Sequence, residues 1–505
     1  MPTFTVDGNA YEVAEGRTIL QALDDLGLLM NGVDIPHYCW HPKLSIDGSC
    51  RLCQVEIEGM PKLQIACNTP VRDGMSISTC SERVHEARRA VMELLLINHP
   101  LDCPICDQAG ECKLQDYAFE YGAPGARTRE PRRPARKSVE LGPTIVFDQE
   151  RCILCRRCVR FCREVSGTGE LGVFSRGDDS VLDTFPGAEL DNPYSMNVAD
   201  ICPVGALTTR DFRFRIRVWF LDDVESVCNQ CANGCNIYAS RSNNRVYRFL
   251  PRRNDAVNET WICDHGRLSY KQIEAGRLTT PRVSGRDCSY VEAVGRAAEL
   301  LQGTRDGGGR ICAVASAFVA NEDLFVLSEL VGALGIEPAI FAVPRGEADG
   351  RLVRAERAPN ANGARALGFT ESYDPPEHAA LAIVLGHALP EPAFAGVDRV
   401  VLLDSQESAL ADRANVVLPT RSFAEREGSF TNHARRVQRF LPIVEPPFEA
   451  WTEAEVLLHI ANETGLEGFK GTPSIREISK RLAETVPAFS GIHLDILGPE
   501  GRELA

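Results

Sequence analysis

Most cysteines in the first half of the chain are spaced as metal ligands. Of the 19 cysteines among 505 residues, 17 precede residue 264. With one histidine they form four consecutive sets: Cys39, Cys50, Cys53 and Cys67; His99, Cys103, Cys106 and Cys112; Cys152, Cys155, Cys158 and Cys202; Cys228, Cys231, Cys235 and Cys263. Each set offers the four soft ligands that an iron–sulfur cluster requires. Several such sites in series on one polypeptide favour electron transfer over catalysis of a single reaction.

The first set fits a binuclear [2Fe–2S] cluster. The loop over residues 47–53 ends in a CxxC pair, and Gly48 lets the backbone approach the sulfurs closely. The ten-residue gap between Cys39 and Cys50 is wider than the plant-type x4 spacing, so the first turn must differ. Zinc is the alternative metal for these thiols.

The residues ahead of this loop predict a ubiquitin-like β-grasp. Residues 4–13 predict two short strands around an Asp7-Gly8 turn. Residues 18–26 have apolar side chains at helical spacing, with Thr18 placed as the cap. Two strands and a helix before a cysteine loop indicate this fold.

The second set needs His99 as its fourth ligand. Three cysteines follow His99 within 13 residues, and no other cysteine is nearby to complete four. A lone histidine at a helix end is more often a surface or capping residue, but the ligand count reverses that reading here. We therefore predict a [4Fe–4S] site after an amphipathic helix over residues 81–98. A neutral imidazole in place of a thiolate lowers the negative charge of the site, which by itself raises its potential.

The third set begins with the run found in bacterial two-cluster ferredoxins. In those proteins the fourth cysteine of each run binds the other cluster, so two complete runs are needed. Only one run is present, and Cys202-Pro203 supplies the remote ligand. Cys162 is therefore predicted to be a buried free thiol. Cys80, Cys288 and Cys312 are scattered, and core packing is their simplest role.

At the fourth set, zinc is a stronger alternative to an iron–sulfur cluster than it is at the other sets. Three close cysteines and the remote Cys263 would also suit a zinc ribbon, although three other cluster sites on the same chain favour iron and sulfur. Residues 212–220 alternate apolar and polar side chains, which predicts a half-buried strand that enters a new domain.

Composition narrows the class of protein. A formal charge of −15 argues against a nucleic-acid binder. The basic stretch over residues 127–137 is predicted to be a solvated connector, with a docking strip for an acidic partner as the alternative. No apolar run approaches the ~18 residues of a membrane span. The first residues have no signal-peptide pattern, so we expect the chain to stay in the cytoplasm unless it travels with a partner.

With the four sets in place, the chain resembles the large iron–sulfur subunits of NADH–quinone oxidoreductase, respiratory complex I, which in bacteria are the G subunits. The motif NHPLDCP at residues 98–104 is highly specific for them. The resemblance implies one [2Fe–2S] cluster on the first set and three [4Fe–4S] clusters on the others, without Cys162. In the family the fourth cluster occurs only in some bacterial members and lies far from the main path, which implies a structural role.

Beyond residue 270 the chain is similar to molybdopterin-dependent oxidoreductases. The similarity lies in Asn321-Glu322, in residues 414–419, in residues 425–432 and in residues 436–438. About 235 residues follow Lys271, whereas molybdenum enzymes need several hundred to enclose the pterin. We therefore expect a shortened scaffold without molybdopterin or an active site, with strands at 311–315, 380–385 and 400–403 and a helix at 324–334.

Together these features predict a multidomain α+β and α/β protein. The expected domains are a 2Fe–2S β-grasp ferredoxin-like domain (1–78), a helical 4Fe–4S domain with one histidine and three cysteine ligands (79–125), a 4Fe–4S ferredoxin-like domain (126–215), a 4Fe–4S domain of the Mo/W bis-MGD type (216–272), and a shortened molybdopterin-oxidoreductase-like α/β scaffold (273–505).

The resemblance also implies a function. The chain would relay electrons from NADH and FMN on a partner subunit toward quinone, within the peripheral arm of a hetero-oligomeric complex on the cytoplasmic face of the inner (plasma) membrane. It would not insert into the membrane itself. No Gly-x-Gly-x-x-Gly follows a predicted strand, so no complete active site is expected on this chain.

Other oxidoreductases share these N-terminal modules. An iron-only hydrogenase needs a further cysteine-rich domain, and a formate dehydrogenase needs the full molybdopterin fold. The diaphorase subunit of a soluble NAD-linked hydrogenase would end soon after the third set. The residue count argues against all three.

Overall fold

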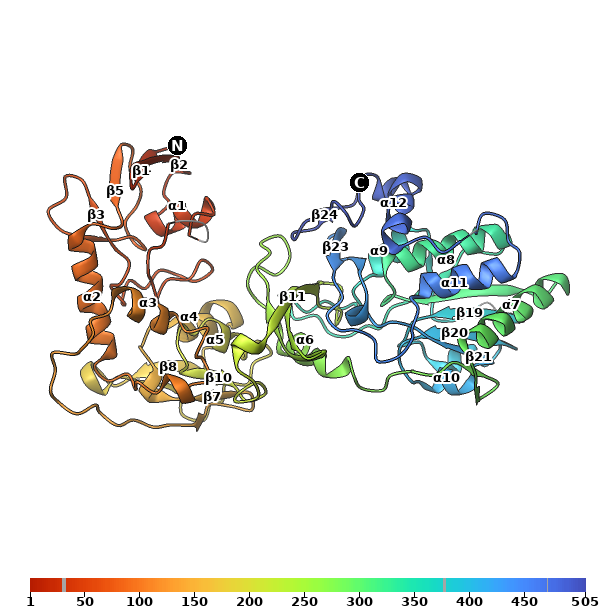
Figure 1. The fold of residues 1–505 in the computed structure, drawn as a ribbon, viewed down its shortest axis with the longest axis horizontal. Helices are drawn as coiled ribbons and strands as arrows, with labels where there is room; N and C mark the ends of the chain where they lie inside the picture. Colours follow the sequence, from red (N-terminus) through yellow and green to blue (C-terminus); the bar gives the residue numbers. More distant parts are fainter. Residues whose placement is uncertain (30–32, 376–377, 470) are drawn as a thin grey trace. The chain divides into compact units, whose positions relative to one another are not determined.

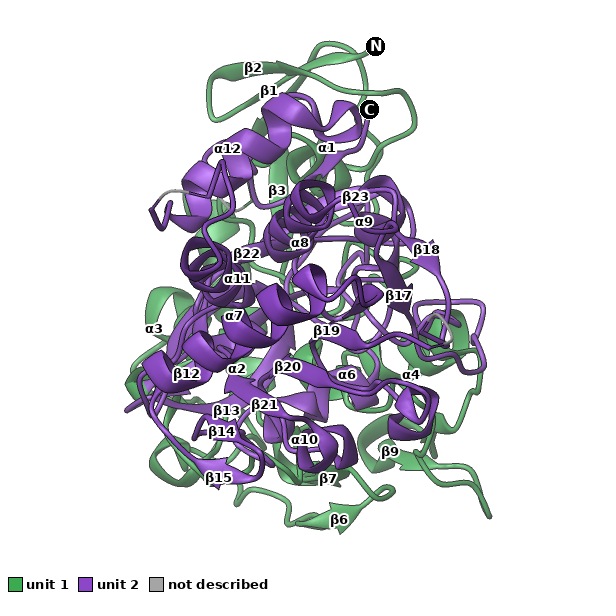
Figure 2. Cartoon of the chain, turned by 90° about the vertical axis from the view of Figure 1, so that its right-hand side faces the viewer, with its two compact units in different colours: residues 1–220 green, residues 221–505 purple. Residues whose placement is uncertain are grey.

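The computed structural model describes residues 1–29, 33–375, 378–469 and 471–505. These residues separate into two compact units, residues 1–220 and 221–505 (Figures 1 and 2). Both units mix helices with sheets, which confirms the predicted multidomain α+β and α/β architecture. The finer division into five domains remains a prediction. No helix in the described ranges is long and apolar enough to cross a membrane.

A β-grasp sheet begins unit 1. Its five strands run in the order β2-β1-β5-β3-β4, and the central pair β1 and β5 is parallel. The strands are β1 (Thr3–Val6), β2 (Asn9–Glu12), β3 (Gln54–Ile57), β4 (Gln64–Ile65) and β5 (Met75–Ser78). Asp7 and Gly8 have positive φ in the predicted hairpin turn, and the Thr18 capping box starts α1 (Ile19–Asp25) as expected.

Four helices and two small sheets make up most of the rest of unit 1. The helices are α2 (Glu82–Leu96), α3 (Lys113–Tyr121), α4 (Arg157–Phe161) and α5 (Asn197–Asp200), with the short turns η1 (Cys103–Ile105) and η3 (Cys162–Ser166). The strands are β6 (Val139–Glu140), β7 (Ile145–Phe147) and β10 (Leu207–Thr209) in one sheet, and β8 (Leu171–Phe174) and β9 (Val181–Thr184) in a hairpin. The amphipathic helix predicted over residues 81–98 is α2, which buries Val84, Arg88 and Met92 and leaves Leu94 68% exposed.

The strand predicted over residues 212–220 is wrong. This segment forms turns and the short helix η5 (Val218–Phe220), and the positive φ of Phe214 interrupts any strand. Arg217 donates hydrogen bonds to the carbonyl oxygens of Cys106 at 2.6 Å and Pro104 at 2.5 Å. The segment therefore wraps around the loop of the second ligand set instead of joining a sheet.

Unit 2 begins with a three-stranded antiparallel sheet that frames the fourth ligand set. Its strands are β11 (Asp222–Val227), β12 (Asn236–Ser242) and β13 (Arg245–Pro251), and α6 (Asp264–Leu268) follows. Cys228 comes directly after β11, Cys235 lies directly before β12, and Cys263 caps α6. Three members of the set thus lie at ends of secondary-structure elements.

An eight-stranded sheet forms the core of unit 2. Its order is β15-β14-β21-β20-β19-β16-β17-β18, and the strands from β21 to β18 are parallel. These strands are β14 (Arg282–Val283), β15 (Arg286–Asp287), β16 (Ile311–Ser316), β17 (Ile340–Ala342), β18 (Thr370–Glu371), β19 (Leu381–Leu385), β20 (Val400–Asp404) and β21 (Val416–Pro419). The predicted strands correspond to β16, β19 and β20, all fully buried, as expected for a parallel sheet covered on both faces.

Helices and a second small sheet complete unit 2. The helices are α7 (Tyr290–Asp306), α8 (Asn321–Leu334), α9 (Ala361–Ala366), α10 (Ala409–Arg413), α11 (Glu453–Glu463) and α12 (Ile475–Thr485). The small sheet contains β22 (Gly428–Thr431), β23 (Arg436–Phe440) and β24 (Arg502–Glu503). The predicted helix over residues 324–334 is part of α8.

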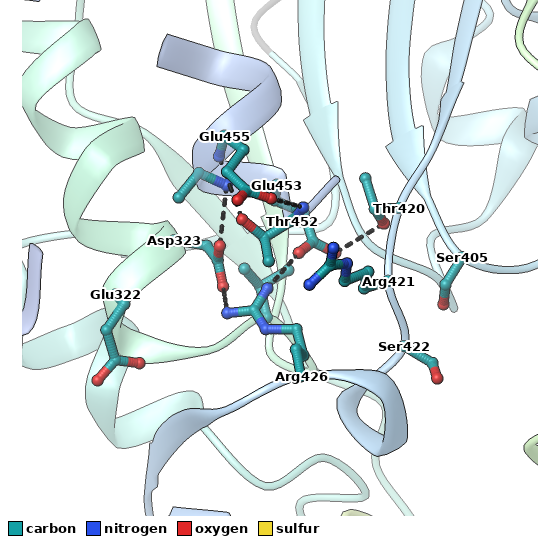
Figure 3. A network of polar contacts seen from close by, with 12 residues as sticks. Glu322, Asp323, Ser405, Thr420, Arg421, Ser422, Arg426, Thr452, Glu453 and Glu455 are labelled. Atoms are coloured by element: carbon teal, nitrogen blue, oxygen red, sulfur yellow. Dashed lines mark hydrogen bonds and ion pairs between the residues drawn. The ribbon is translucent and has the colours of Figure 1, made fainter. Parts of the chain in front are cut away.

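A buried charge network fastens α8, α11 and the segment before β22 to one another (Figure 3). The Arg426 guanidinium pairs with Asp323 and, at 2.6 Å, with Glu453. Asp323 accepts a hydrogen bond from the Ala454 N–H at 2.9 Å, and Glu453 accepts one from the Thr420 hydroxyl at 2.9 Å. Each carboxylate is therefore both ion-paired and hydrogen-bonded, which is the condition for burying charge.

Removing the cation of this network is expected to destabilise unit 2. Arg426→Met keeps an apolar stem but leaves Asp323 and Glu453 buried without a countercharge, which costs about 3–5 kcal/mol. Arg296→Met is the matched control, because Arg296 is exposed and its ion pair is with exposed Glu299. The free energies of unfolding come from urea denaturation, and a loss below about 1 kcal/mol for Arg426→Met would contradict the assigned role.

Candidate metal centres

The four cysteines of the first set lie together on the β-grasp loops. Cys53 precedes β3, and Cys67 follows β4, whose neighbour Ala66 donates its N–H to the Cys53 carbonyl at 2.8 Å. Hydrogen bonds from Cys50 and Cys67 hold the pKa of Cys39 well below its usual range. Hydrogen bonds with Cys39 and then Cys53 raise the pKa of Cys67. These contacts join all four sulfurs into one group.

Gly48 has the backbone conformation that the first-set loop requires. Its φ is +69°, in the left-handed region that glycine adopts at little cost. A Cβ at Gly48 would meet only the Ile65 side chain, at 3.4 Å, so the close approach to the sulfurs stays a prediction.

The three cysteines of the second set lie around η1 and the start of α3. Cys103 begins η1, Cys106 follows it, and Cys112 caps α3. Burial raises the pKa of Cys112 to about 11, and the charges of Cys106 and Cys103 add to this effect. The three thiols therefore act on one another electrostatically.

His99 lies in the same surroundings with a free ring nitrogen. Its Nδ1 is buried and has no hydrogen-bond partner among the described residues. Burial lowers the pKa of His99 to about 4, so the imidazole is neutral near pH 7, as a metal ligand must be. The charge of Arg151 acts on both His99 and Cys106. His99 and the cysteines thus share a neighbourhood that suits a cluster with one nitrogen ligand.

The four members of the third set line a single cavity. The cavity has about 390 Å³ of empty space, open solvent included, and its apolar lining includes Val173, Leu182, Val204 and Leu207. Burial raises the pKa of Cys152 and of Cys202 to about 12, and the charge of Cys155 contributes to both increases. The Leu154 N–H donates to the Cys152 sulfur at 3.4 Å. Four thiols around a mainly apolar cavity are a good fit for a cluster.

Cys162 does not line this cavity. It is buried, and burial and the charge of Glu170 raise its pKa to about 12. Its surroundings agree with the predicted free thiol rather than a fifth ligand.

The fourth set also gathers around a single point of the backbone. A Cβ on Gly266 would lie 3.0 Å from the Cys228 sulfur and 3.3 Å from the Cys263 sulfur. Asn233 donates to the Cys235 sulfur at 3.1 Å, and the Gly266 N–H donates to the Cys263 sulfur at 3.3 Å. Burial raises the pKa of Cys235, and the charges of Cys231 and Cys263 add to it. Donors aimed at sulfur are what a ligated thiolate uses.

The first three sites adjoin one another within unit 1. Arg160 donates hydrogen bonds to the carbonyl oxygens of Cys39 in the first set and, at 3.4 Å, Cys155 in the third. The Cys112 thiol of the second set lies 3.9 Å from the Pro203 carbonyl, next to Cys202. The spatial order is therefore first, third, second. Throughout the described chain, no three or more His, Cys, Asp or Glu side chains are arranged to hold a single metal ion.

Sequence reasoning missed the residues that connect the sites. Arg151, Arg157 and Arg160 are interleaved with the cysteines of the third run, and this pattern was the available signal. Gly205 is a second omission, because a Cβ there would lie 2.4 Å from the Cys106 sulfur. The residues next to Gly205 in the sequence gave no signal, because the sulfur that Gly205 approaches, that of Cys106, belongs to the second set.

Comparison with family models covers each ligand set with a separate match. Residues 1–82 match a 2Fe–2S iron–sulfur cluster binding domain, and residues 88–127 match an NADH-ubiquinone oxidoreductase-G iron–sulfur binding region. Residues 142–208 match the ferredoxin-like domain of NADH-quinone oxidoreductase subunit 3, and residues 221–271 match an NDSU1/NuoG-like 4Fe–4S domain. Residues 1–271 belong to the NADH–quinone oxidoreductase G-subunit family. The resemblance inferred from ligand spacing is confirmed.

Similarity to individual proteins agrees with the family assignment of residues 1–271. The chain is 41% identical over 338 residues to the mitochondrial NADH-ubiquinone oxidoreductase 78 kDa subunit of Candida albicans. The aligned region covers 66% of this chain and 46% of that relative. It is 40% identical over 339 residues to the NADH-quinone oxidoreductase G subunit of Rickettsia felis, and the aligned region covers 66% of this chain and 49% of that relative. The chain thus spans about half the length of these relatives.

The remaining comparisons concern the C-terminal part and solved structures. Residues 391–463 match a molybdopterin oxidoreductase model, which confirms the predicted likeness there. A chain from a crystal structure of an NAD+-reducing [NiFe]-hydrogenase is 32% identical, covers 43% of this chain and 91% of its own, and has a TM-score of 0.37. At that TM-score no shared fold follows.

Gly205→Ala is expected to disturb the second site. The added methyl group would lie 2.4 Å from the Cys106 sulfur, and such overpacking costs about 1–3 kcal/mol. We expect a changed EPR signal from the second site, while the first site, which Gly205 does not touch, keeps its signal. Gly295→Ala is the control, because a Cβ there meets nothing within 4 Å. An unchanged EPR spectrum of Gly205→Ala would contradict this packing.

Proposed function

We propose that the chain is an electron-transfer subunit in the peripheral arm of an NADH–quinone oxidoreductase. Its task is to relay electrons that originate from NADH and FMN on a partner subunit toward quinone. The observation that carries this proposal is the adjacency of three ligand sets within unit 1, each inside its own cluster-binding family match. The chain contributes to the enzyme as part of its complex, without a complete active site of its own.

We assign one [2Fe–2S] cluster to the first set and one [4Fe–4S] cluster to each of the other three. When bound, these groups supply one-electron carriers. The thiolates and the neutral His99 imidazole hold the iron, apolar side chains exclude water, and N–H donors such as those of Leu154 and Gly266 stabilise the sulfurs. The adjacency of the sites supports a relay in the order first, third, second.

The fourth site and the C-terminal scaffold take a structural role in this proposal. The fourth set belongs to unit 2, whereas the three adjoining sets belong to unit 1. A hollow at the carboxyl ends of β16, β19 and β20 includes Phe318, His387, Ser405 and Glu453 among its walls. No cysteine is among the described residues that line it, so nothing there offers molybdenum a thiolate, and we propose that this unit works without molybdopterin.

The proposed partners are the FMN- and NADH-binding subunit and other peripheral-arm subunits. The relatives are named as subunits of NADH oxidoreductases, which supports assembly into a hetero-oligomer. We place the chain on the cytoplasmic face of the inner (plasma) membrane, held there by its complex.

Metal analysis tests the cluster assignment. The purified native complex should yield about 14 iron atoms per copy of this chain, after subtraction of the iron of other subunits, with matching sulfide and no molybdenum. Stoichiometric flavin and membrane subunits should co-purify with the chain. Zinc in place of the last four irons would remove the fourth cluster, and purification without a flavoprotein partner would contradict the proposed relay.

His99→Ala tests the nitrogen ligand separately. The substitution removes one ligand of the second set and touches no other set, so only the EPR signal of the second site should change. His99→Cys is the informative companion, because a thiolate restores a soft ligand with added negative charge and should lower the potential of that site. A wild-type spectrum from His99→Ala would show that another group binds the iron.

A further inference from the structure

Arg157 and Arg160, which lie within the cysteine run of the third set, donate hydrogen bonds to the loop of the first set. Arg160, which is 4% exposed, donates hydrogen bonds to the carbonyl oxygens of Cys39, Ser45 and Cys155. Arg157 donates to the carbonyl oxygens of Trp40 and, at 3.2 Å, Ile201. Four of these five acceptors belong to a ligand or to its immediate neighbour. The two side chains therefore span the space between the first and third sites.

Neither guanidinium has a carboxylate partner in the described ranges. The ion pairs nearby use other residues, since Asp47 pairs with the Arg156 guanidinium at 3.7 Å, and Glu164 accepts hydrogen bonds from Ser45 and from exposed Arg163. The Nε atoms of Arg157 and Arg160 are also buried without a hydrogen-bond partner. Two cations are thus held by neutral carbonyl oxygens alone.

Such an arrangement is costly unless negative charge lies close. Moving an ion out of water costs several kcal/mol even after relaxation, and a buried cation is normally paired. The charges that act most strongly on Arg157 are all thiols of the two sites: Cys155, Cys202, Cys39 and Cys50. Arg157 and Arg160 in turn lower the pKa of Cys155, against the dominant effect of burial. The missing anionic partners are therefore the ligand sets themselves.

We propose that Arg157 and Arg160 are positioning residues that act as shared countercations of the first and third sites. This inference rests on the cluster assignment proposed above. Reduction of a cluster adds one negative charge, and a fixed cation between two clusters favours the reduced state of each. The arginines neither gain nor lose a proton in this role. The hydrogen bonds of Arg160 to Cys39 and Cys155, and those of Arg157 to Trp40 and Ile201, also keep the two ligand loops at a fixed separation.

The charge role differs from that of a simple hydrogen-bonding staple. A lysine at either position keeps the cation but loses the planar five-donor geometry, whereas glutamine keeps some donors and loses the charge. A countercation role predicts that the lysine variants retain wild-type potentials and that the glutamine variants do not. A staple predicts that both substitutions shift the potentials alike.

The test is an EPR-monitored redox titration of the complex that contains the full chain. For Arg160→Gln and Arg157→Gln we expect about a tenfold shift of the reduction equilibrium toward the oxidised state at both sites, which is about 59 mV for one electron. Arg160→Lys and Arg157→Lys should stay within about threefold of wild type. The fourth site is the internal control, and Arg163→Gln is the matched variant, because Arg163 is exposed on the same segment.

Each outcome bears on the proposal. Wild-type potentials in the glutamine variants, equal shifts in glutamine and lysine variants, or an equal shift at the fourth site would overturn it. Where a glutamine variant does not assemble, the lysine variant decides: wild-type potentials support the countercation role, and lowered ones refute it. Absence of the first or third signal from the wild-type complex would instead contradict the cluster assignment, so the two failures are distinguishable.

Discussion

The burial of thiolate charge is the constraint on which the rest of unit 1 depends. Apolar surroundings raise the pKa of Cys152, Cys202 and Cys112, so these sulfurs are protonated unless something positive holds them as thiolates. Iron supplies most of that charge when bound, and N–H donors and arginines supply the remainder. The surrounding chain must therefore exclude water and at the same time bring cations and donors to the sulfurs.

This double requirement explains why the elements next to the ligand sets of unit 1 are short. A sulfur can accept backbone N–H groups only where the backbone is not already paired within a helix or sheet. The Cys263 sulfur accordingly accepts the Gly266 N–H at the start of α6, Cys112 occupies the N-cap position of α3, and Cys53 precedes a strand. The long connections between such ends need their own fastening. The arginines of the third run provide it by binding carbonyl oxygens across the ligand loops.

The sequence predicted what depends on local pattern and ligand count. The β1–β2 hairpin, the Thr18 cap and the buried strands β16, β19 and β20 follow from spacing along a few residues. Long-range contacts left no such trace. Arg160 and Cys39 are 121 positions apart, and the alternation over residues 212–220 reflects a segment that wraps a loop rather than a strand. Gly205 is required by a sulfur of another ligand set, so its own neighbours could not reveal it.

Unit 2 retains the doubly wound sheet but not the electrostatics of an anion site. After β16, strands β17 and β18 lie on one side of it and β19, β20 and β21 on the other, so the strand order changes direction between β16 and β19. Doubly wound sheets bind ligands at this point, and the N-terminus of the helix after the first strand usually faces a phosphate there. Here the first turn of α8 carries Glu322 and Asp323, both buried. Asp323 is neutralised by Arg426 and Glu322 is bound by Ser429, so the cationic and donor capacity at this position is used within the protein. A phosphate at this helix end would meet two carboxyl groups, which supports the scaffold role proposed for this sheet.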